Sequence, residues 1–133
     1  MQGTSIGIRP RDLNDLIGKL KHGLPVGAFD RLRVRLDVPE KILASTVNIA
    51  YRTLSRRKKE GRFKTDESER VLRIAKLYEK ALDVLEDDEI ARQWFKMPAK
   101  ALGGKTPLEY ADTEPGAHEV EDLLVRIEYG VFS

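Results

Sequence analysis

The sequence predicts an all-α protein, and three observations lead to this prediction. Apolar residues recur at intervals of three and four along most of the chain, which is the spacing of one face of a helix. Glycine and proline interrupt these stretches where helices would end, and threonine or acidic residues stand where the next helices would begin. At 133 residues and 41% hydrophobic content, the chain can bury one modest core or two small subdomains packed together.

Helices are expected from residue 12 onward. Residues 1–11 are polar and contain Gly3, Gly7 and Pro10, which favours a flexible, frayed lead-in over a packed element. Two supporting helices follow before residue 39. Their apolar faces contain Leu13, Leu16, Ile17 and Leu20 in the first helix and Phe29, Leu32 and Leu36 in the second.

Residues 40–59 fit the spacing of a helix-turn-helix. The fifth position is the small Ala44, where two helices would cross closely, and the ninth is Asn48, which tolerates the left-handed backbone of the turn. Position eighteen is usually apolar but holds Arg57, which predicts a second helix that is shorter or rotated relative to the common pattern. Four positions that normally face the core hold Leu43, Val47, Ile49 and Leu54.

Cationic residues are concentrated at the end of this segment. Seven of the thirteen residues from 52 to 64 are lysine or arginine, against a single Glu60. Repulsion between like charges four residues apart on one helix costs about 0.2–0.5 kcal/mol per pair. Attraction to DNA phosphates would more than offset this cost. The alternative is a basic face that is simply solvated.

A longer helix is predicted next, with Thr65 as its cap and with Asp66 and Glu67 in its first turn. An apolar stripe along this helix can face a neighbouring helix of the same chain or a second copy, and the sequence alone does not separate these alternatives. The first alternative is favoured. The stripe consists of Val71, Ala75, Tyr78, Leu82 and Leu85.

An acidic hinge over residues 83–89 leads into a final helical region. A short helix with Trp94 in the core ends at Pro98, and a Gly103-Gly104 turn precedes a capping box that starts at Thr106. Thr113 then opens the last helix. Its apolar residues cover more than one face, so a partner can cover the excess; they are Ala117, Val120, Leu123, Leu124, Val125, Ile127 and Val131.

Composition argues against an enzyme, a metalloprotein and a membrane protein. The chain has no cysteine, its two histidines lie far apart in the sequence, and no hydroxyl stands in a recognisable nucleophile motif. The acidic hinge lacks the residue order of a calcium loop, and the glycines near Lys105 lack the spacing of a nucleotide loop. No cofactor or metal is therefore expected. No apolar run approaches the roughly 18 residues of a membrane span, and a cytoplasmic location is expected.

The small net charge of +2 conceals two regions of opposite charge. Residues 1–82 hold 19 basic and 10 acidic side chains, whereas residues 83–133 hold 5 basic and 12 acidic ones. Such asymmetry predicts a polyanionic partner for the first region and a different partner for the second. The alternative is that both charges serve only solubility.

The order of residues near the C-terminus carries a family resemblance. Trp94, Met97-Pro98, the run from Leu102 to Glu109, Thr113, Gly116 and the run from Arg126 to Gly130 follow one another. This order resembles the toxin-binding domain of the Xre/MbcA/ParS antitoxin family, bacterial proteins encoded beside RES-domain toxins, and the resemblance extends upstream to about residue 37. It implies an Xre-like helix-turn-helix region over residues 12–82 and a small helical toxin-binding domain over residues 83–133.

Members of this family bind an NAD-consuming RES-domain toxin and cover its active-site cleft with their C-terminal domain. The resemblance therefore implies a cognate RES-domain toxin as the partner of the acidic region. The candidate toxin contacts on matching positions are Leu102, Gly103, Gly104, Lys105, Thr106, Glu109, Arg126, Glu128, Tyr129, Val131, Phe132 and Ser133.

The Xre-like region implies operator binding as a homodimer within a larger toxin–antitoxin complex, and hence repression of the protein's own operon. Residues expected to face the major groove are Tyr51, Arg52, Ser55, Arg56 and Lys59, and those expected to meet phosphates are Arg57, Lys58, Arg62 and Lys64. The competing prediction is a stand-alone transcription regulator whose C-terminal domain serves only dimerisation. RNA binding is disfavoured because Tyr51 and Phe63 are the only aromatic residues of the basic segment.

Overall fold

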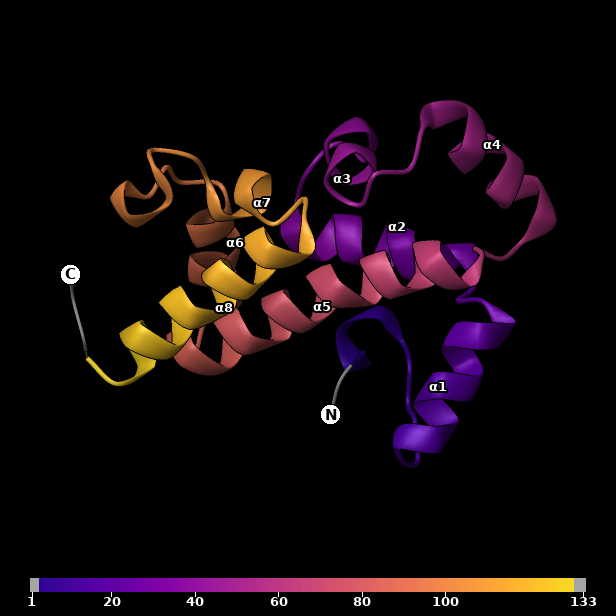
Figure 1. Ribbon diagram of the computed structural model, residues 1–133, viewed down its shortest axis with the longest axis horizontal. Helices are drawn as coiled ribbons and strands as arrows, with labels where there is room; N and C mark the ends of the chain where they lie inside the picture. The colour runs from indigo at the N-terminus through magenta and orange to yellow at the C-terminus, as the bar shows by residue number, and fades with distance from the viewer. Residues whose placement is uncertain (1–2, 131–133) are drawn as a thin grey trace.

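The 21-residue helix α5 (Thr65–Leu85) forms the centre of the computed structural model, which describes residues 3–130. It packs most extensively on α8 (Glu114–Glu128), and α1, α2 and α6 also lie against it (Figure 1). Val71, Ala75 and Tyr78 of the predicted stripe are fully buried within the chain. The stripe therefore faces neighbouring helices of the same chain, as favoured from the sequence.

The prediction of an all-α fold is confirmed over the described residues. Two short 3-10 turns accompany the helices, and the only strand-like contact in this part of the chain is an isolated bridge between Pro25 and Arg62. The remaining elements in chain order are η1 (Thr4–Ile6), α1 (Leu13–His22), α2 (Val26–Leu36), α3 (Glu40–Thr46), α4 (Tyr51–Glu60), α6 (Asp88–Phe95), η2 (Lys100–Leu102) and α7 (Pro107–Tyr110).

Side-chain caps begin several of these helices, because a side-chain oxygen can accept a backbone N–H that lacks a partner in the first turn. Asp12, Asp87, Thr106 and Thr113 each accept from the residue three positions later. The predicted roles of Thr106 and Thr113 are thus confirmed. Thr65 does not have its predicted role as the cap of α5, because it is the first helical residue and Lys64 occupies the cap position. There the Glu67 carboxylate accepts the backbone N–H of Lys64 at 2.8 Å.

The turn between α3 and α4 has the geometry that the sequence predicts for a helix-turn-helix. Asn48 adopts a left-handed backbone with φ of 55°, and Ala44 is buried where the two helices approach. Two long-range contacts hold this turn in place. Arg70 of α5 donates to the carbonyl oxygen of Val47 at 2.6 Å, and the Asn48 amide donates to the carbonyl oxygen of Asp112 at 2.7 Å.

The N-terminal segment is packed, so the prediction of a frayed lead-in over residues 1–11 is wrong for residues 3–10. Ile6 and Ile8 are buried against the core. The Glu79 carboxylate on α5 accepts the backbone N–H of Gly3 at 2.9 Å and that of Ser5 at 3.1 Å, and the Ser5 hydroxyl at 2.5 Å. A carboxylate more than 70 residues away thus satisfies the donors of a segment that looks unstructured in sequence.

Replacing Glu79 by alanine should release this segment, because three donors would lose their common acceptor. We expect a loss of about 1–3 kcal/mol in unfolding free energy, together with faster amide hydrogen exchange at residues 3–8. Asp83→Ala is the matched control, since Asp83 is an exposed carboxylate one turn further along α5. Equal exchange rates in both variants would contradict this role of Glu79.

The predicted domain boundary at residues 82 and 83 falls inside α5, which continues to Leu85. Asp83 is therefore helical, while Glu86 ends α5 with a left-handed backbone and Asp87 caps α6. Trp94 is half-buried against the core, next to the fully buried Phe95. Because α5 packs on both α2 and α8, the two predicted regions share one hydrophobic core.

Candidate nucleic-acid and partner-binding interfaces

One face of α4 carries the residues predicted to enter the major groove. These residues together line a single shallow depression on the protein surface, and all but the half-buried Ser55 are exposed. They are Tyr51, Arg52, Ser55, Arg56 and Lys59. The helix that carries them begins after the extended Ala50 and ends at Gly61, whose φ of 91° favours glycine. We call this surface the basic face.

Arg57 lies on the opposite side of α4 and is only 4% exposed. Its guanidinium donates to Glu67 of α5 at 2.7 and 3.1 Å and to Glu60 at 2.9 Å. The prediction that Arg57 meets phosphates is therefore wrong, because its donors are occupied inside the protein. α4 continues past Arg57 to Glu60, and a buried ion pair with Glu67 takes the place of the usual apolar side chain at this position.

The other predicted phosphate contacts differ in whether their charged groups are already paired within the protein. Lys58 pairs with Glu40 of α3 at 2.6 Å, which neutralises part of its charge. Arg62 is exposed, but one of its nitrogens donates to the carbonyl oxygen of Gly23 at 2.9 Å and so holds the loop after α1. Lys64 is exposed at the start of α5. Lys64 is thus placed to meet a polyanion with little rearrangement, whereas Lys58 must leave its carboxylate.

Glu67 links the stability of this region to pH. Burial raises the pKa of its carboxyl group, but hydrogen bonds from Arg57 and from the Lys64 amide lower it by more, so the pKa lies below its ordinary value of 4.5. Hydrogen bonding to Glu67 likewise raises the pKa of Arg57, which keeps the guanidinium charged. A carboxyl group with a lowered pKa stabilises the folded state above its unfolded pKa, and this contribution disappears as the pH falls through the folded pKa.

We therefore expect the unfolding free energy to decrease as the pH falls below 4.5, the ordinary pKa of Glu67. Glu67→Gln does not titrate at this position and should show a smaller decrease over the same interval. Urea unfolding midpoints measured at intervals of about one unit between about pH 7 and about pH 3 would show the difference. Glu69→Gln, on the exposed side of α5, is the control that should keep the original pH dependence.

Arg70 and Asp112 are contacts of the helix-turn-helix that the sequence analysis missed. Arg70 donates to the carbonyl oxygens of Val47 and Asn48, and the carbonyl oxygen of Asp112 accepts from Asn48. The only local signal is Asp66, four residues before Arg70, which suggests a surface ion pair instead. The turn of the predicted DNA-binding unit is thus held by groups that lie 22 or more residues away in sequence.

The glycine turn and the capping box near the C-terminus have the predicted local structure. Gly103 and Gly104 have φ values of 68° and 85°, and Thr106 and Glu109 cap each other's backbone amides. Both glycines and Lys105 are exposed. Leu102 is only 2% exposed, so its predicted role as a toxin contact is wrong for the side chain, which fills the core.

The end of α8 supplies the second part of the predicted partner surface. Tyr129 is 76% exposed, whereas Arg126 is half-buried and its Nε atom has no hydrogen-bond partner among the described residues. Glu128 pairs with Lys80 of α5 at 3.0 Å, and this hydrogen bond raises the pKa of Lys80. Val131, Phe132 and Ser133 lie outside the described residues.

The packing of α7 against α8 requires glycine at position 116 of the C-terminal motif. A Cβ atom at this position would lie 1.8 Å from the carbonyl oxygen of Tyr110, so only glycine allows the first turn of α8 to approach α7 this closely. This approach fixes α7 against α8. Figure 1 shows the glycine turn and the end of α8 at one end of the molecule and α4 at the other.

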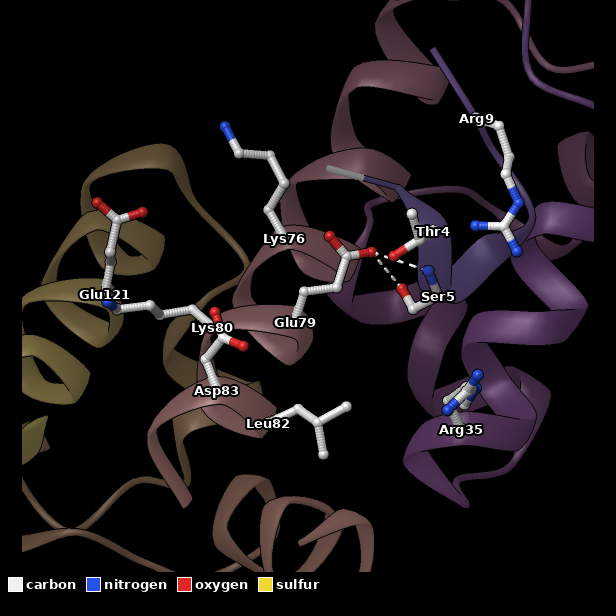
Figure 2. Close-up of a pocket in the computed structure, with 10 residues that line it drawn as sticks. All are labelled: Thr4, Ser5, Arg9, Arg35, Lys76, Glu79, Lys80, Leu82, Asp83 and Glu121. Carbon is white, nitrogen blue, oxygen red and sulfur yellow. Dashed lines mark hydrogen bonds between the residues drawn. The ribbon is translucent and has the colours of Figure 1, made fainter. Parts of the chain in front are cut away.

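Figure 2 shows a cleft between the N-terminal segment, α2, α5 and α8, with a volume of about 560 Å³. Two of its four basic side chains and one of its carboxylates are already engaged within the protein. Lys80 pairs with Glu128, Arg35 lies 3.5 Å from Asp88, and Glu79 accepts the N-terminal donors. The Ser5 hydroxyl in this cleft donates to a carboxylate that other donors hold in place, which indicates a structural role.

Among residues 3–130, no three or more histidine or acidic side chains gather in a way that could hold a metal ion. None of the helices between these residues is both long enough and apolar enough to cross a membrane.

Comparison with known families matches both regions of the chain. Residues 15–76 match the family model of the antitoxin Xre-like helix-turn-helix domain, and residues 80–130 match that of the antitoxin Xre/MbcA/ParS C-terminal toxin-binding domain. The first match ends and the second begins within α5, so they divide the chain between residues 76 and 80. The exposed basic face lies in the first matched region, and the glycine turn and Tyr129 lie in the second.

Curated relatives cover most of the chain. An "Antitoxin Xre" of Yersinia enterocolitica is 36% identical over 120 residues, which are 89% of this chain and 81% of the relative. An "Antitoxin Xre" of Photorhabdus laumondii is 36% identical over 116 residues, covering 86% and 78% of the two chains. A "Prs ADP-ribosylating antitoxin" of a Sphingobium species is 30% identical over 129 residues, covering 90% and 81%.

Proposed function

The chain belongs to the Xre/MbcA/ParS family of antitoxins, and on this premise we propose that it binds a RES-domain toxin, blocks that toxin's NAD-degrading active site, and represses its own operon. One observation carries the proposal. Helix α4, which carries the exposed basic face, and the end of α8, which the exposed Tyr129 follows, lie at opposite ends of a molecule with one shared core (Figure 1). The protein can therefore hold DNA and a protein partner at the same time.

The toxin-binding part of the proposal rests on the exposed glycine turn, Lys105 and Tyr129. A large exposed aromatic residue beside a terminus is the kind of group that fills a pocket of a partner. The surrounding region is acidic, with 12 acidic and 5 basic side chains over residues 83–133. Such a charge complements a toxin cleft that is basic because it binds the phosphates of a dinucleotide. In this proposal the chain inhibits by occlusion and has no catalytic role of its own.

Co-expression with the product of the adjacent gene tests this part directly. We expect the two proteins to purify together and the NAD turnover of the complex to fall far below that of the free partner. A chain lacking residues 126–133 should release the turnover and harm cells that contain the partner. If no complex forms, the chain is instead a stand-alone regulator whose C-terminal region serves dimerisation. A complex that retains full NAD turnover would contradict occlusion of the active site.

The DNA-binding part rests on the basic face. Arg52, Arg56 and Lys59 are exposed on the second helix of a helix-turn-helix, which is the helix that such motifs place in the major groove. A homodimer would present two such helices to a two-fold operator near the protein's own genes. Contacts to base edges would then provide specificity, while Lys64 and other peripheral cations would add attraction that is independent of sequence.

Arg56→Ala should weaken operator binding more than random-DNA binding, because an arginine that reads a base edge contributes about 1–3 kcal/mol of discrimination. Lys64→Ala should weaken both by a similar factor, because a phosphate contact does not depend on sequence. Fluorescence anisotropy titrations on both duplexes at several salt concentrations would measure these effects. Equal losses for Arg56→Ala on the two duplexes would remove Arg56 from base readout.

A further inference from the structure

An apolar groove lies between α3 and the first half of α4, beside the basic face. Its floor consists of Ala44, Ile49 and Leu54, whose side chains are buried in the protein but line this opening. Lys41, Ser45 and the ring of Tyr51 form its exposed rim. We call this feature the α3–α4 groove.

The groove is continuous with the surface that we propose for DNA. Tyr51 is the first residue of α4, is 77% exposed, and lines both the groove and the depression on the basic face. Its ring therefore separates apolar floor on one side from Arg52 and Arg56 on the other. An extended ligand that lies along the basic face and passes Tyr51 would reach the groove.

The charge at the rim also favours a polyanion. Among the described residues, Glu40 is the only acidic one that lines the groove, and Lys58 pairs with it at a distance of 2.6 Å. Lys41 leaves the rim with a positive charge, next to the cations of the basic face. A groove with an apolar floor and a cationic border suits a ligand that has small apolar groups on an anionic scaffold.

We propose that the α3–α4 groove receives the C5-methyl groups of thymines in the operator, with the ring of Tyr51 packed against them. The proposal rests on the DNA-binding function proposed above and specifies part of the sequence that the protein prefers. In the major groove, the C5-methyl group is the apolar feature of a thymine edge, and apolar side chains contact it directly. The second helix of a helix-turn-helix brings its first residues to this edge.

Duplexes in which deoxyuridine replaces thymidine test the proposal, because this exchange removes the methyl group and keeps base pairing. The probe is the promoter duplex upstream of the chain's own gene, with each thymine of the protected footprint replaced in turn. Loss of one buried methyl group should weaken binding by about threefold to fivefold at one or more positions in each half-site. 5-Methylcytosine placed opposite guanine at other positions should give no comparable gain.

A mutant cycle assigns the effect to the groove. Tyr51→Ala should weaken binding to the thymine duplex but change binding to the matching deoxyuridine duplex by less than about twofold, because the methyl contact is already absent there. Arg52→Ala is the control from the basic face, and it should weaken binding to both duplexes by the same factor. Tyr51 is exposed at the helix start, so its replacement should leave the melting temperature unchanged.

Three results would overturn the proposal. The first is that deoxyuridine exchange changes the binding affinity by less than about twofold at every thymine of the footprint. The second is that the losses of binding free energy from Tyr51→Ala and from the exchange simply add. The third is that Tyr51→Ala shifts the monomer–dimer equilibrium in sedimentation while the exchange leaves DNA binding unchanged, which would assign the groove to a second copy. Binding to the unmodified promoter duplex separates this proposal from the proposed function. If the protein does not bind that duplex at all, the proposed repression is contradicted together with the role of the groove.

Discussion

Arg57→Ala should destabilise the protein by about 3–5 kcal/mol, because it leaves the buried Glu67 carboxylate without its charge partner. Glu67 is 6% exposed, so water cannot replace the lost hydrogen bonds without opening the packing between α4 and α5. For a chain of 133 residues this corresponds to a decrease in melting temperature of roughly 10–20 °C. Thermal and urea unfolding would measure both quantities.

The double variant Arg57→Leu with Glu67→Gln separates a broken ion pair from lost packing. Leucine fills the apolar space that this helix position usually holds, and glutamine keeps an oxygen that can accept the Lys64 amide. We expect the double variant to recover at least half of the stability lost in Arg57→Ala, since buried ion pairs contribute little beyond a well-packed apolar pair. An equally unstable double variant would show that the ion pair itself is required.

The same double variant checks that Arg57 is not a phosphate contact. Its folded form should bind the promoter duplex with an affinity within about threefold of the original protein and with the same salt dependence. A phosphate contact would instead reduce the slope of affinity against salt by about one unit. That reduced slope would contradict the placement of Arg57 inside the protein.

Tyr129→Ala should weaken binding of the partner toxin by at least about 30-fold, the effect of an aromatic hot spot of 2 kcal/mol or more. The proposed mechanism demands this, because Tyr129 is the large exposed group at the end of α8. The stability of the free chain should change by less than about 0.5 kcal/mol, since the side chain packs on little of its own protein. Inhibition of NAD turnover and calorimetric titration would measure the two effects.

Tyr51→Ala is a matched control for this experiment. It makes the same substitution at a tyrosine of nearly the same exposure, 77% against 76%. Tyr51 begins α4, which lies at the opposite end of the molecule from the end of α8 (Figure 1). Toxin inhibition should be unaffected by Tyr51→Ala, and promoter binding in the absence of toxin should be unaffected by Tyr129→Ala. If Tyr129→Ala inhibits as well as the original chain, the toxin surface must lie elsewhere, for example on the glycine turn alone.

Local sequence signals predicted most of the secondary structure. Proline at the first position of α7, the threonine caps of α7 and α8 and the left-handed Asn48 depend on neighbours within a few residues, and all three are found as expected. The apolar stripe of α5 was also correctly assigned to the interior. These features depend on spacing and on side-chain chemistry, which the sequence states directly.

Errors arose where the partner of a polar group lies far away in the chain. In the sequence, Arg57 looks like a DNA contact, but in the structure it pairs with Glu67. Leu102 looks available for a toxin contact, but its side chain is buried in the core. Gly3 and Ser5 look unstructured until Glu79 accepts their donors. In each example the local pattern is ambiguous, and burial decides between the alternatives.

The sequence by itself determined the helical class, the position of the helix-turn-helix, the opposite charges of the two regions and the family resemblance near the C-terminus. Only the tertiary structure decided which cations remain exposed, how the N-terminal segment packs, and that the α3–α4 groove adjoins the basic face. The physical reason is that helix formation follows from local spacing and capping, whereas burial and pairing of a charged side chain depend on groups that folding brings together.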